Sequence, residues 1–143
     1  MNVANILKTK GRAVTTARPE ATISEIAAKL ASKKIGAIVI VGDNGRVTGI
    51  ISERDLVRVI AEHGPAALQK PASAVMTSQV VSCHEGVTVD ELMDIMTTGR
   101  FRHVPVIEAG ALVGLVSIGD VVKYHVADMA LEVTAMKNYL ATG

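Results

Sequence analysis

The stretch Gly49-Ile50-Ile51-Ser52-Glu53-Arg54-Asp55 decides the fold, because its pattern returns at Gly114-Leu115-Val116-Ser117-Ile118-Gly119-Asp120. Each stretch reads as Gly, two apolar residues, Ser, two variable residues and Asp. The apolar run is typical of a strand, and Ser is a preferred residue at the start of a helix. Each strand is therefore expected to pass into a helix without a loop, which places the helix N-terminus at the end of a sheet.

A second pair of stretches extends the repeat to a whole supersecondary unit. Residues 22–30 match residues 88–96 in their Thr, Glu and apolar positions. Thr22 with Glu25, and Thr88 with Glu91, form the Thr-x-x-Glu capping boxes that mark helix N-termini. We therefore expect two copies of one unit that pack about a pseudo-twofold axis, with a related pair of clefts between them. Such an arrangement favours a binding function.

Hydrophobic periodicity predicts the order strand, helix, strand, strand, helix in each copy. In the first copy, the strands are expected at 13–16, 37–41 and 46–51, and the helices begin after Thr22 and at Ser52. In the second copy, the strands are expected at 80–82, 104–107 and 112–116. Short amphipathic pieces at 3–7 and 71–76 precede the two copies. The sequence therefore predicts an α+β fold made of two β-α-β-β-α units.

Composition narrows the classes of function. The 143 residues are 49% apolar but only 2% aromatic, and the formal net charge is +1. Neither a field that attracts nucleic acid nor a stacking surface for single strands is expected. Cys83 is the only cysteine, which is typical of a reducing compartment. No signal peptide and no membrane-spanning run are evident, so we expect a cytoplasmic protein.

The repeated Ser and Asp allow two interpretations. Ser at the N-cap, followed by an acid at the third helical residue, is itself a capping box. A helix N-terminus also favours an anion or a hydroxyl-rich ligand, and one carboxylate accepts both hydroxyls of a vicinal diol such as a ribose. Asp is expected to reach back to the N-cap less well than Glu, which the other two boxes use. The Asp in both copies therefore favours the ligand interpretation.

The last helix continues beyond the repeated unit and carries a heptad seam. The apolar residues of this seam, spaced alternately by four and three, are Val122, Val126, Met129, Val133, Met136 and Leu140. The seam is compatible with packing against the chain's own core and equally with contact in a homodimer.

Two further stretches complete the pattern. Arg18-Pro19-Glu20-Ala21-Thr22 leads into the first helix, and Phe101-Arg102-His103-Val104-Pro105-Val106 precedes the second hairpin. With the repeated motif, in this order, the chain resembles a pair of cystathionine-β-synthase-type (CBS) domains, the regulatory Bateman module. We expect the domains at 6–64 and 71–127, and a C-terminal helix extension at 128–143. The resemblance implies an adenosyl ligand, such as AMP, ADP, ATP or NAD, in one or both clefts.

The resemblance also implies roles for particular residues of the first copy. Asp55 would accept the ribose hydroxyls, with Ser52 beside the ribose or phosphate. Thr16 would meet the adenine through backbone groups, and Ala21 would line it. Where the family often contacts phosphate, this copy has Gly36 and Ala37, and Val39 replaces the family's proline. Arg54 is expected to supply the missing positive charge.

The second copy matches the family more fully. By the same resemblance, Asp120 would accept the ribose hydroxyls and Ser117 would lie beside the ribose or phosphate. Ser82 would meet the adenine through its backbone, and Val87 would line it. The remaining matches, two at phosphate positions and one at the family's proline, are Arg102, His103 and Pro105. The two sites therefore cannot be equivalent.

Several charged residues keep two interpretations. His103 is either a phosphate contact or a partly exposed polar residue at a strand start. Lys8, Lys10 and Arg12 are either a solvated charge run or phosphate contacts. The remaining candidates for metal ligation have no partners at ligand spacing, so no metal site is expected; these are His63, Cys83, His84 and His125.

No phosphate loop, nucleophile elbow or acid–base pair is present, so an enzyme is not expected. The leading hypothesis is a stand-alone adenine-nucleotide sensor, homodimeric, whose bound state is read by an unknown partner protein. The alternative is a protein–protein interaction scaffold of CBS fold that needs no small ligand. Intact Asp55 and Asp120 favour the sensor.

Overall fold

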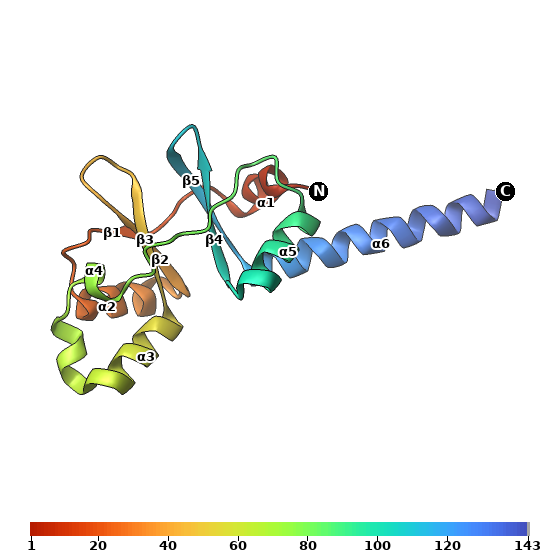
Figure 1. The fold of residues 1–143 in the computed structure, drawn as a ribbon. Helices are drawn as coiled ribbons and strands as arrows, with labels where there is room; N and C mark the ends of the chain where they lie inside the picture. The colour runs from red at the N-terminus through yellow and green to blue at the C-terminus, as the bar shows by residue number, and fades with distance from the viewer. Residues whose placement is uncertain (143) are drawn as a thin grey trace. The chain divides into compact units, whose positions relative to one another are not determined.

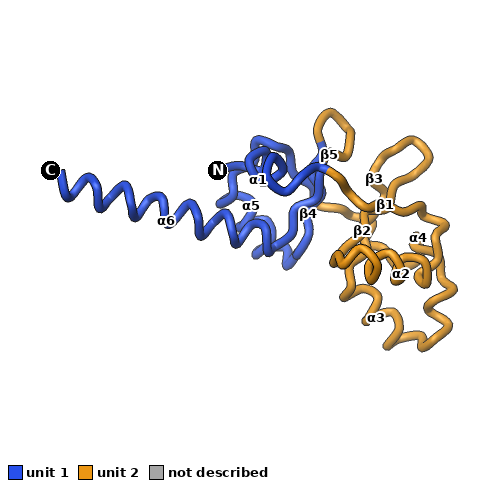
Figure 2. Tube along the Cα trace, turned by 180° about the vertical axis from the view of Figure 1, so that it is seen from behind, with its two compact units in different colours: residues 1–12, 82–107, 114–143 blue, residues 13–81, 108–113 orange. Residues whose placement is uncertain are grey.

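The computed structural model describes residues 1–142, which form two compact units (Figure 1, Figure 2). Unit 1 combines residues 1–12, 82–107 and the chain from 114 onward, and it carries most of the second copy of the repeat. Unit 2 combines residues 13–81 and 108–113, and it carries the first copy. Each unit therefore contains segments that are distant in the sequence.

Unit 2 is built on a three-stranded sheet in the order β1-β2-β3. Strand β2 (Ala37–Val41) runs parallel to β1 (Thr16–Ala17) and antiparallel to β3 (Val47–Ser52). The helices of unit 2 are α2 (Ile23–Lys33), α3 (Glu53–His63), the 3-10 helix η1 (Gly64–Gln69) and α4 (Ala72–Val75). One face of α2 and the inner face of the sheet share a core that contains Ile23, Ile26, Leu30, Ile38, Ile40 and Ile51.

Unit 1 contains the two-stranded sheet of β4 (His103–Glu108) and β5 (Ala111–Ser117), whose tip belongs to unit 2. Its helices are α1 (Val3–Lys10), α5 (Val89–Gly99) and α6 (Ile118–Thr142). The apolar face of α5 is buried as its periodicity predicted, with Val89 and Leu92 both 0% exposed. Both expected hairpins and all four expected helix starts are therefore confirmed.

The first strand of each copy differs from the prediction. In the first copy the strand lies at Thr16–Ala17 rather than at 13–16. In the second copy the strand expected at 80–82 is wrong, because only Cys83 pairs, through an isolated parallel bridge to Val106. The difference has a backbone cause. Val39 donates its N–H to the Thr15 carbonyl at 3.4 Å, whereas Pro105, at the equivalent place, has no N–H to donate.

The short helices α1 and α4 exchange places between the two copies. Helix α1 precedes the first copy but packs in unit 1, with the second copy, and α4 precedes the second copy but packs in unit 2, with the first. In unit 1, Val3 donates its backbone N–H to Val87 O at 2.9 Å, beside the start of α5. In unit 2, Ala72 donates to Ala21 O at 2.7 Å, beside the start of α2. The two copies therefore use the same local design, a short helix docked against the N-terminus of the repeat's first helix.

This docking explains the glycine that opens each repeated motif. A Cβ at Gly114 would lie 2.6 Å from Leu7 Cδ2, and a Cβ at Gly49 would lie 2.3 Å from Met76 Sδ. Carbon atoms in contact are normally about 3.5–4.0 Å apart. The glycines thus let Leu7 of α1 and Met76, the residue after α4, lie directly against the strands, a role that the sequence did not reveal.

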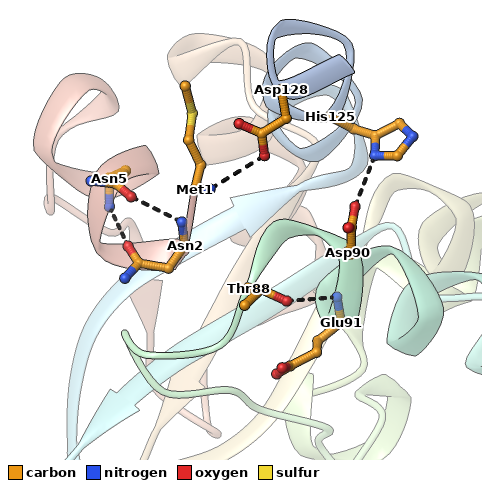
Figure 3. A network of polar contacts seen from close by, with 8 residues as sticks. All are labelled: Met1, Asn2, Asn5, Thr88, Asp90, Glu91, His125 and Asp128. Carbon is orange, nitrogen blue, oxygen red and sulfur yellow. Dashed lines mark hydrogen bonds and ion pairs between the residues drawn. The ribbon is translucent and has the colours of Figure 1, made fainter. Parts of the chain in front are cut away.

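The N-terminus of the chain is tied to α5 and α6 (Figure 3). Asn2 and Asn5 form a reciprocal capping box at the start of α1. The terminal ammonium of Met1 lies 3.3 Å from Asp128 of α6. The same helix contacts α5 through His125 Nδ1, which lies 3.1 Å from Asp90 Oδ1. These contacts fix the first half of α6 within unit 1.

Candidate functional site

The repeated Ser and Asp form a complete capping box at the start of α3. Ser52 donates its backbone N–H to Asp55 Oδ2 at 2.9 Å, and Asp55 donates its own N–H to Ser52 Oγ at 3.4 Å. Both side chains are partly buried. The carboxylate therefore sits at the positive end of the helix dipole, with one oxygen committed to the N-cap.

The start of α6 repeats this geometry closely. Ser117 donates its backbone N–H to Asp120 Oδ2 at 3.0 Å, and Asp120 returns its N–H to Ser117 Oγ at 3.2 Å. The expectation that Asp would reach back poorly is therefore wrong, because both Asp residues close their boxes. In both, the cap engages only Oδ2, and the second oxygen, Oδ1, takes no part in the cap. The capping role does not compete with a diol contact through Oδ1.

One backbone contact brings the expected phosphate positions next to these caps. Glu53, the first residue of α3, donates its N–H to Gly36 O at 3.0 Å, and Ala37 pairs with Ser52. In the second copy, Ile118 donates in the same way to Arg102 O at 2.8 Å. The structure thus unites Gly36 and Ala37 with the first cap, although the Ala37 side chain is buried.

The second cap differs from the first in its cations. Lys10 Nζ lies 2.6 Å from Asp120 Oδ2 and donates to Leu115 O at 2.7 Å. Burial of Asp120 opposes its ionisation, but hydrogen bonds from Lys10 and Ser117 outweigh burial, and the pKa of Asp120 is held below its ordinary value. Lys10 therefore forms a specific ion pair with Asp120, although its side chain remains exposed. Arg12 likewise forms an ion pair with Glu85.

At the first cap the neighbouring cation is Arg58. Its guanidinium Nη2 lies 3.3 Å from Asp55 Oδ1, one turn along α3. Arg58 is exposed, and so is Arg54, which the sequence singled out. The spacing of three residues from Asp55 was the available signal for Arg58, because residues three apart on a helix share a face.

The expected adenine positions of the first copy lie together in a pocket of unit 2. This pocket has a volume of about 520 Å³, and Thr16, Ala21, Glu25 and Lys29 are among its lining residues. Thr16 pairs with Val39, and Val41, at the opposite end of β2 from Ala37, also lines the pocket, whereas Ser52 and Asp55 are not among its lining residues. The volume of the pocket falls within the range of small-molecule sites.

Lys29 was not expected at this pocket. Its ammonium donates to the Thr16 carbonyl oxygen at 3.0 Å. This is the carbonyl of a residue that the family resemblance assigns to the adenine. A base that donates a hydrogen bond to this oxygen has to share or displace the Lys29 contact.

The equivalent residues of the second copy lie in unit 1. Val87 is buried beside the start of α5, and Pro105 is buried on β4, where its carbonyl accepts from Cys83 N at 3.0 Å. Ser82, one residue before Cys83, is exposed, and His103 is partly exposed. The predicted residues of the first copy therefore all lie in unit 2 and those of the second copy all lie in unit 1.

Two features of residues 1–142 bear on other classes of function. This part of the chain holds no group of three or more His, Cys, Asp or Glu side chains placed to bind a metal ion. Among the same residues, no helix has the combination of length and apolarity needed to cross a bilayer.

Comparison with known proteins adds to this geometry. The model of the CBS domain family matches residues 5–62 and 72–127. A solved CBS-domain protein from Agrobacterium tumefaciens is 52% identical, with a TM-score of 0.83 over 85% of this chain and 91% of that chain. A protein from Pyrobaculum aerophilum, solved with AMP, is 28% identical, with a TM-score of 0.75 over 84% and 89% of the two chains.

A third similar structure was solved with two other ligands. It is a CBS domain pair in complex with 5′-methylthioadenosine and S-adenosyl-L-methionine. It is 26% identical, with a TM-score of 0.79 over 90% of this chain and 98% of that chain. AMP and these two molecules have an adenosine group in common.

Proposed function

Because this chain belongs to the family of CBS domain proteins, we propose that it is a regulatory module that binds an adenine nucleotide and signals its bound state to a partner protein. The observation that carries the proposal is the Ser–Asp cap, present in both copies with the Asp Oδ2 on the N-cap. Oδ1 of Asp120 lies outside the cap and can accept a ribose hydroxyl, whereas a hydroxyl at Asp55 Oδ1 would share that oxygen with Arg58. Similar structures that contain AMP, 5′-methylthioadenosine or S-adenosyl-L-methionine support the adenosyl class of ligand.

The charges near the two caps favour a phosphate-bearing ligand at the second site. Arg102 precedes β4 and its carbonyl joins the cap of α6, and His103 follows it. Lys10 already lies at the Asp120 carboxylate. A nucleotide phosphate at this place would therefore lie near the cations Lys10 and Arg102. The candidate ligands are AMP, ADP, ATP and NAD.

Location, oligomeric state and a partner protein complete the proposed function. We expect a cytoplasmic, homodimeric, non-catalytic protein whose regulated partner recognises the nucleotide-bound form. The absence of a phosphate loop or nucleophile elbow in the sequence supports a regulatory rather than a catalytic role.

Ligand binding is tested by isothermal titration calorimetry with AMP, ADP, ATP and NAD, and by native mass spectrometry of the freshly purified protein. AMP has roughly 23 non-hydrogen atoms, which at about −0.3 kcal/mol per atom corresponds to a Kd on the order of 10 μM. Binding is expected to raise the melting temperature by mass action. Neither heat nor a thermal shift at millimolar ligand would refute the sensor function.

The ribose contact is tested by a substitution that preserves the cap. Asp120→Asn keeps one oxygen to accept the Ser117 N–H but replaces the second carboxylate oxygen by an amide. Its affinity for adenosine is expected to fall about tenfold, as for loss of a hydrogen bond to a charged group, with little change for 2′,3′-dideoxyadenosine. Asp55→Asn is the matched variant for the first site. If the affinities for adenosine and 2′,3′-dideoxyadenosine fall equally, Asp120 does not contact the ribose hydroxyls and acts only as a helix cap.

Phosphate recognition is tested separately with Arg102→Ala. This variant is expected to weaken AMP and ATP while leaving adenosine nearly unchanged, because adenosine has no phosphate. A parallel loss of adenosine affinity would place Arg102 outside the phosphate site.

One observation favours the alternative of a scaffold without a small ligand. The Thr16 carbonyl and the Asp120 carboxylate are already engaged by Lys29 and Lys10. A site whose polar groups have partners within the chain needs no ligand to satisfy them. The calorimetric and thermal-shift experiments decide between the two functions, because a scaffold gives no response to any of the four nucleotides.

A further inference from the structure

The second half of α6 has no packing partner within the described chain. Val121 is fully buried, and His125 and Asp128 contact α5 and the N-terminus. From Met129 to Thr142 every residue is exposed. Figure 1 and Figure 2 show the helix running on past the other elements of unit 1. At 1.5 Å per residue this free part is about 20 Å long.

The heptad seam lies on the exposed side of α6 along its whole length. Its members are 45% exposed at Val122, 58% at Val126, 52% at Met129, 53% at Val133, 59% at Met136 and 70% at Leu140. Val121 and Tyr124, which face unit 1, are more buried than their seam neighbours. Packing of the seam against the chain's own core, which the sequence left open, therefore does not occur in this structure.

We propose that the second half of α6 pairs with the same helix of a second copy, parallel and in register, as a two-stranded coiled coil. The heptad places Val126, Val133 and Leu140 at a positions and Val122, Met129 and Met136 at d positions. β-branched residues at a favour two parallel strands. This inference deepens the homodimer of the proposed function but does not depend on the nucleotide.

Charge complementarity decides the orientation of the two helices. In the same register Glu132 occupies a g position and Lys137, five residues later, occupies the following e position. In a parallel pair, g of one helix faces the next e of the other, so Glu132 of each copy meets Lys137 of the other. The twofold axis creates two such pairs, one on each side of the seam.

An antiparallel pair has no such attraction. There, e positions face e positions and g positions face g positions. The e residues are Lys123, Ala130 and Lys137, and the g residues are His125, Glu132 and Tyr139. No Glu–Lys pair forms in any of these combinations. Because α6 itself carries both Glu132 and Lys137, a second copy of the helix completes both ion pairs. The partner of α6 is therefore a second copy rather than an unrelated helix.

Cysteine cross-linking of the full chain tests the register. In a parallel pair, identical a positions lie opposite each other, within reach of a disulfide. Val133→Cys is therefore expected to form a covalent dimer on mild oxidation. Asn138→Cys, at the outward f position, is the control and is expected to stay largely monomeric in denaturing electrophoresis. The parent chain, whose single Cys83 is buried, serves as the blank.

Charge exchange tests the pairing without touching the apolar seam. Glu132→Lys alone and Lys137→Glu alone each replace two attractions by two repulsions, and each is expected to raise the dimer Kd by about tenfold. Mixing the two variants restores the attraction across each pair. Heterodimers are therefore expected to exceed the statistical half of the dimers in native mass spectrometry.

The outcomes separate this inference from the wider proposal. A dimer with no cross-link at residue 133, or with equal cross-linking at residues 133 and 138, refutes the coiled coil but leaves the homodimer. A monomer in sedimentation velocity at micromolar concentration refutes both. Loss of nucleotide binding in calorimetry has no bearing on the helix pair, because Glu132 and Lys137 lie outside the nucleotide site.

Discussion

Replacing Gly114 by Ala tests the packing that underlies the repeated motif. The added Cβ would lie 2.6 Å from Leu7 Cδ2 and 2.8 Å from Cδ1. Relief of this overlap requires a shift of roughly 1 Å, and Leu7 is only 1% exposed, so it has little space to move. Overpacking of this kind costs about 1–3 kcal/mol, which in a chain of this size lowers the Tm by about 3–10 °C.

A double-mutant cycle isolates the clash from other effects of the substitution. Leu7→Ala alone leaves a cavity and is expected to cost about 2–5 kcal/mol in the free energy of unfolding. In the double variant the methyl group added at position 114 no longer meets the Leu7 side chain and fills part of that cavity. The loss of unfolding free energy in the double variant is therefore expected to be about 1–3 kcal/mol smaller than the sum of the losses in the two single variants. Urea unfolding followed by circular dichroism measures all three losses.

Gly119→Ala is the matched control within the same motif. Its Cβ would meet only Ser117 Oγ, at 3.7 Å, an ordinary contact in the first turn of α6. This variant is expected to be neutral or slightly stabilising, because Ala is the better helix former. If Gly114→Ala is as mild as this control, or if the cycle is additive within about 0.5 kcal/mol, the packing role of Gly114 is refuted.

Three other variants probe the charges and the seam. Lys10→Met removes the partner that helps to lower the pKa of Asp120, so it is expected to cost up to about 1 kcal/mol above about pH 4. The part of this cost that is due to Asp120 should disappear as the pH falls through the folded-state pKa, since Asp120 is then protonated in both proteins. Urea unfolding at several pH values measures it, and a cost that does not change with pH would contradict it. Arg58→Ala is expected to lower AMP affinity at the first site about tenfold, with Arg54→Ala unchanged in the same calorimetric titration; the reverse order would restore the sequence-based choice of Arg54. The double change Met129→Glu and Val133→Glu is expected to yield monomers in light scattering without loss of folding stability, because both side chains are exposed; a large loss of stability would place the seam in the chain's own core.

The order of the elements and their boundaries were largely predictable from the sequence, because local signals define them. Thr22 and Thr88 accept hydrogen bonds from Glu25 N at 3.2 Å and Glu91 N at 3.1 Å, so both predicted N-caps form, although only this half of each predicted capping box is present. The turn at Gly42 and Gly45 also closes as expected, with Gly45 N donating to Gly42 O at 3.0 Å. Each of these contacts joins residues only a few positions apart.

The errors arose where a long-range partner decides the outcome. The strand expected at 80–82 depends on β4, where Pro105 cannot donate a hydrogen bond. The sequence also suggested that Asp would cap poorly, but the helix geometry brings Asp55 and Asp120 within 3.0 Å of the N-cap nitrogens. Whether a side chain can cap a helix N-terminus depends on backbone dihedral angles, which the sequence pattern alone does not determine.

The residue pattern by itself determined the duplicated unit, the α+β class and the repeated Ser–Asp pair, because repeats and caps are local and periodic. Only the tertiary structure decided which groups surround those pairs. Lys10 is 110 residues from Asp120 in the chain, and Leu7 faces Gly114 from an equally distant segment. Such contacts depend on how separate segments pack, and no local signal in the sequence encodes them.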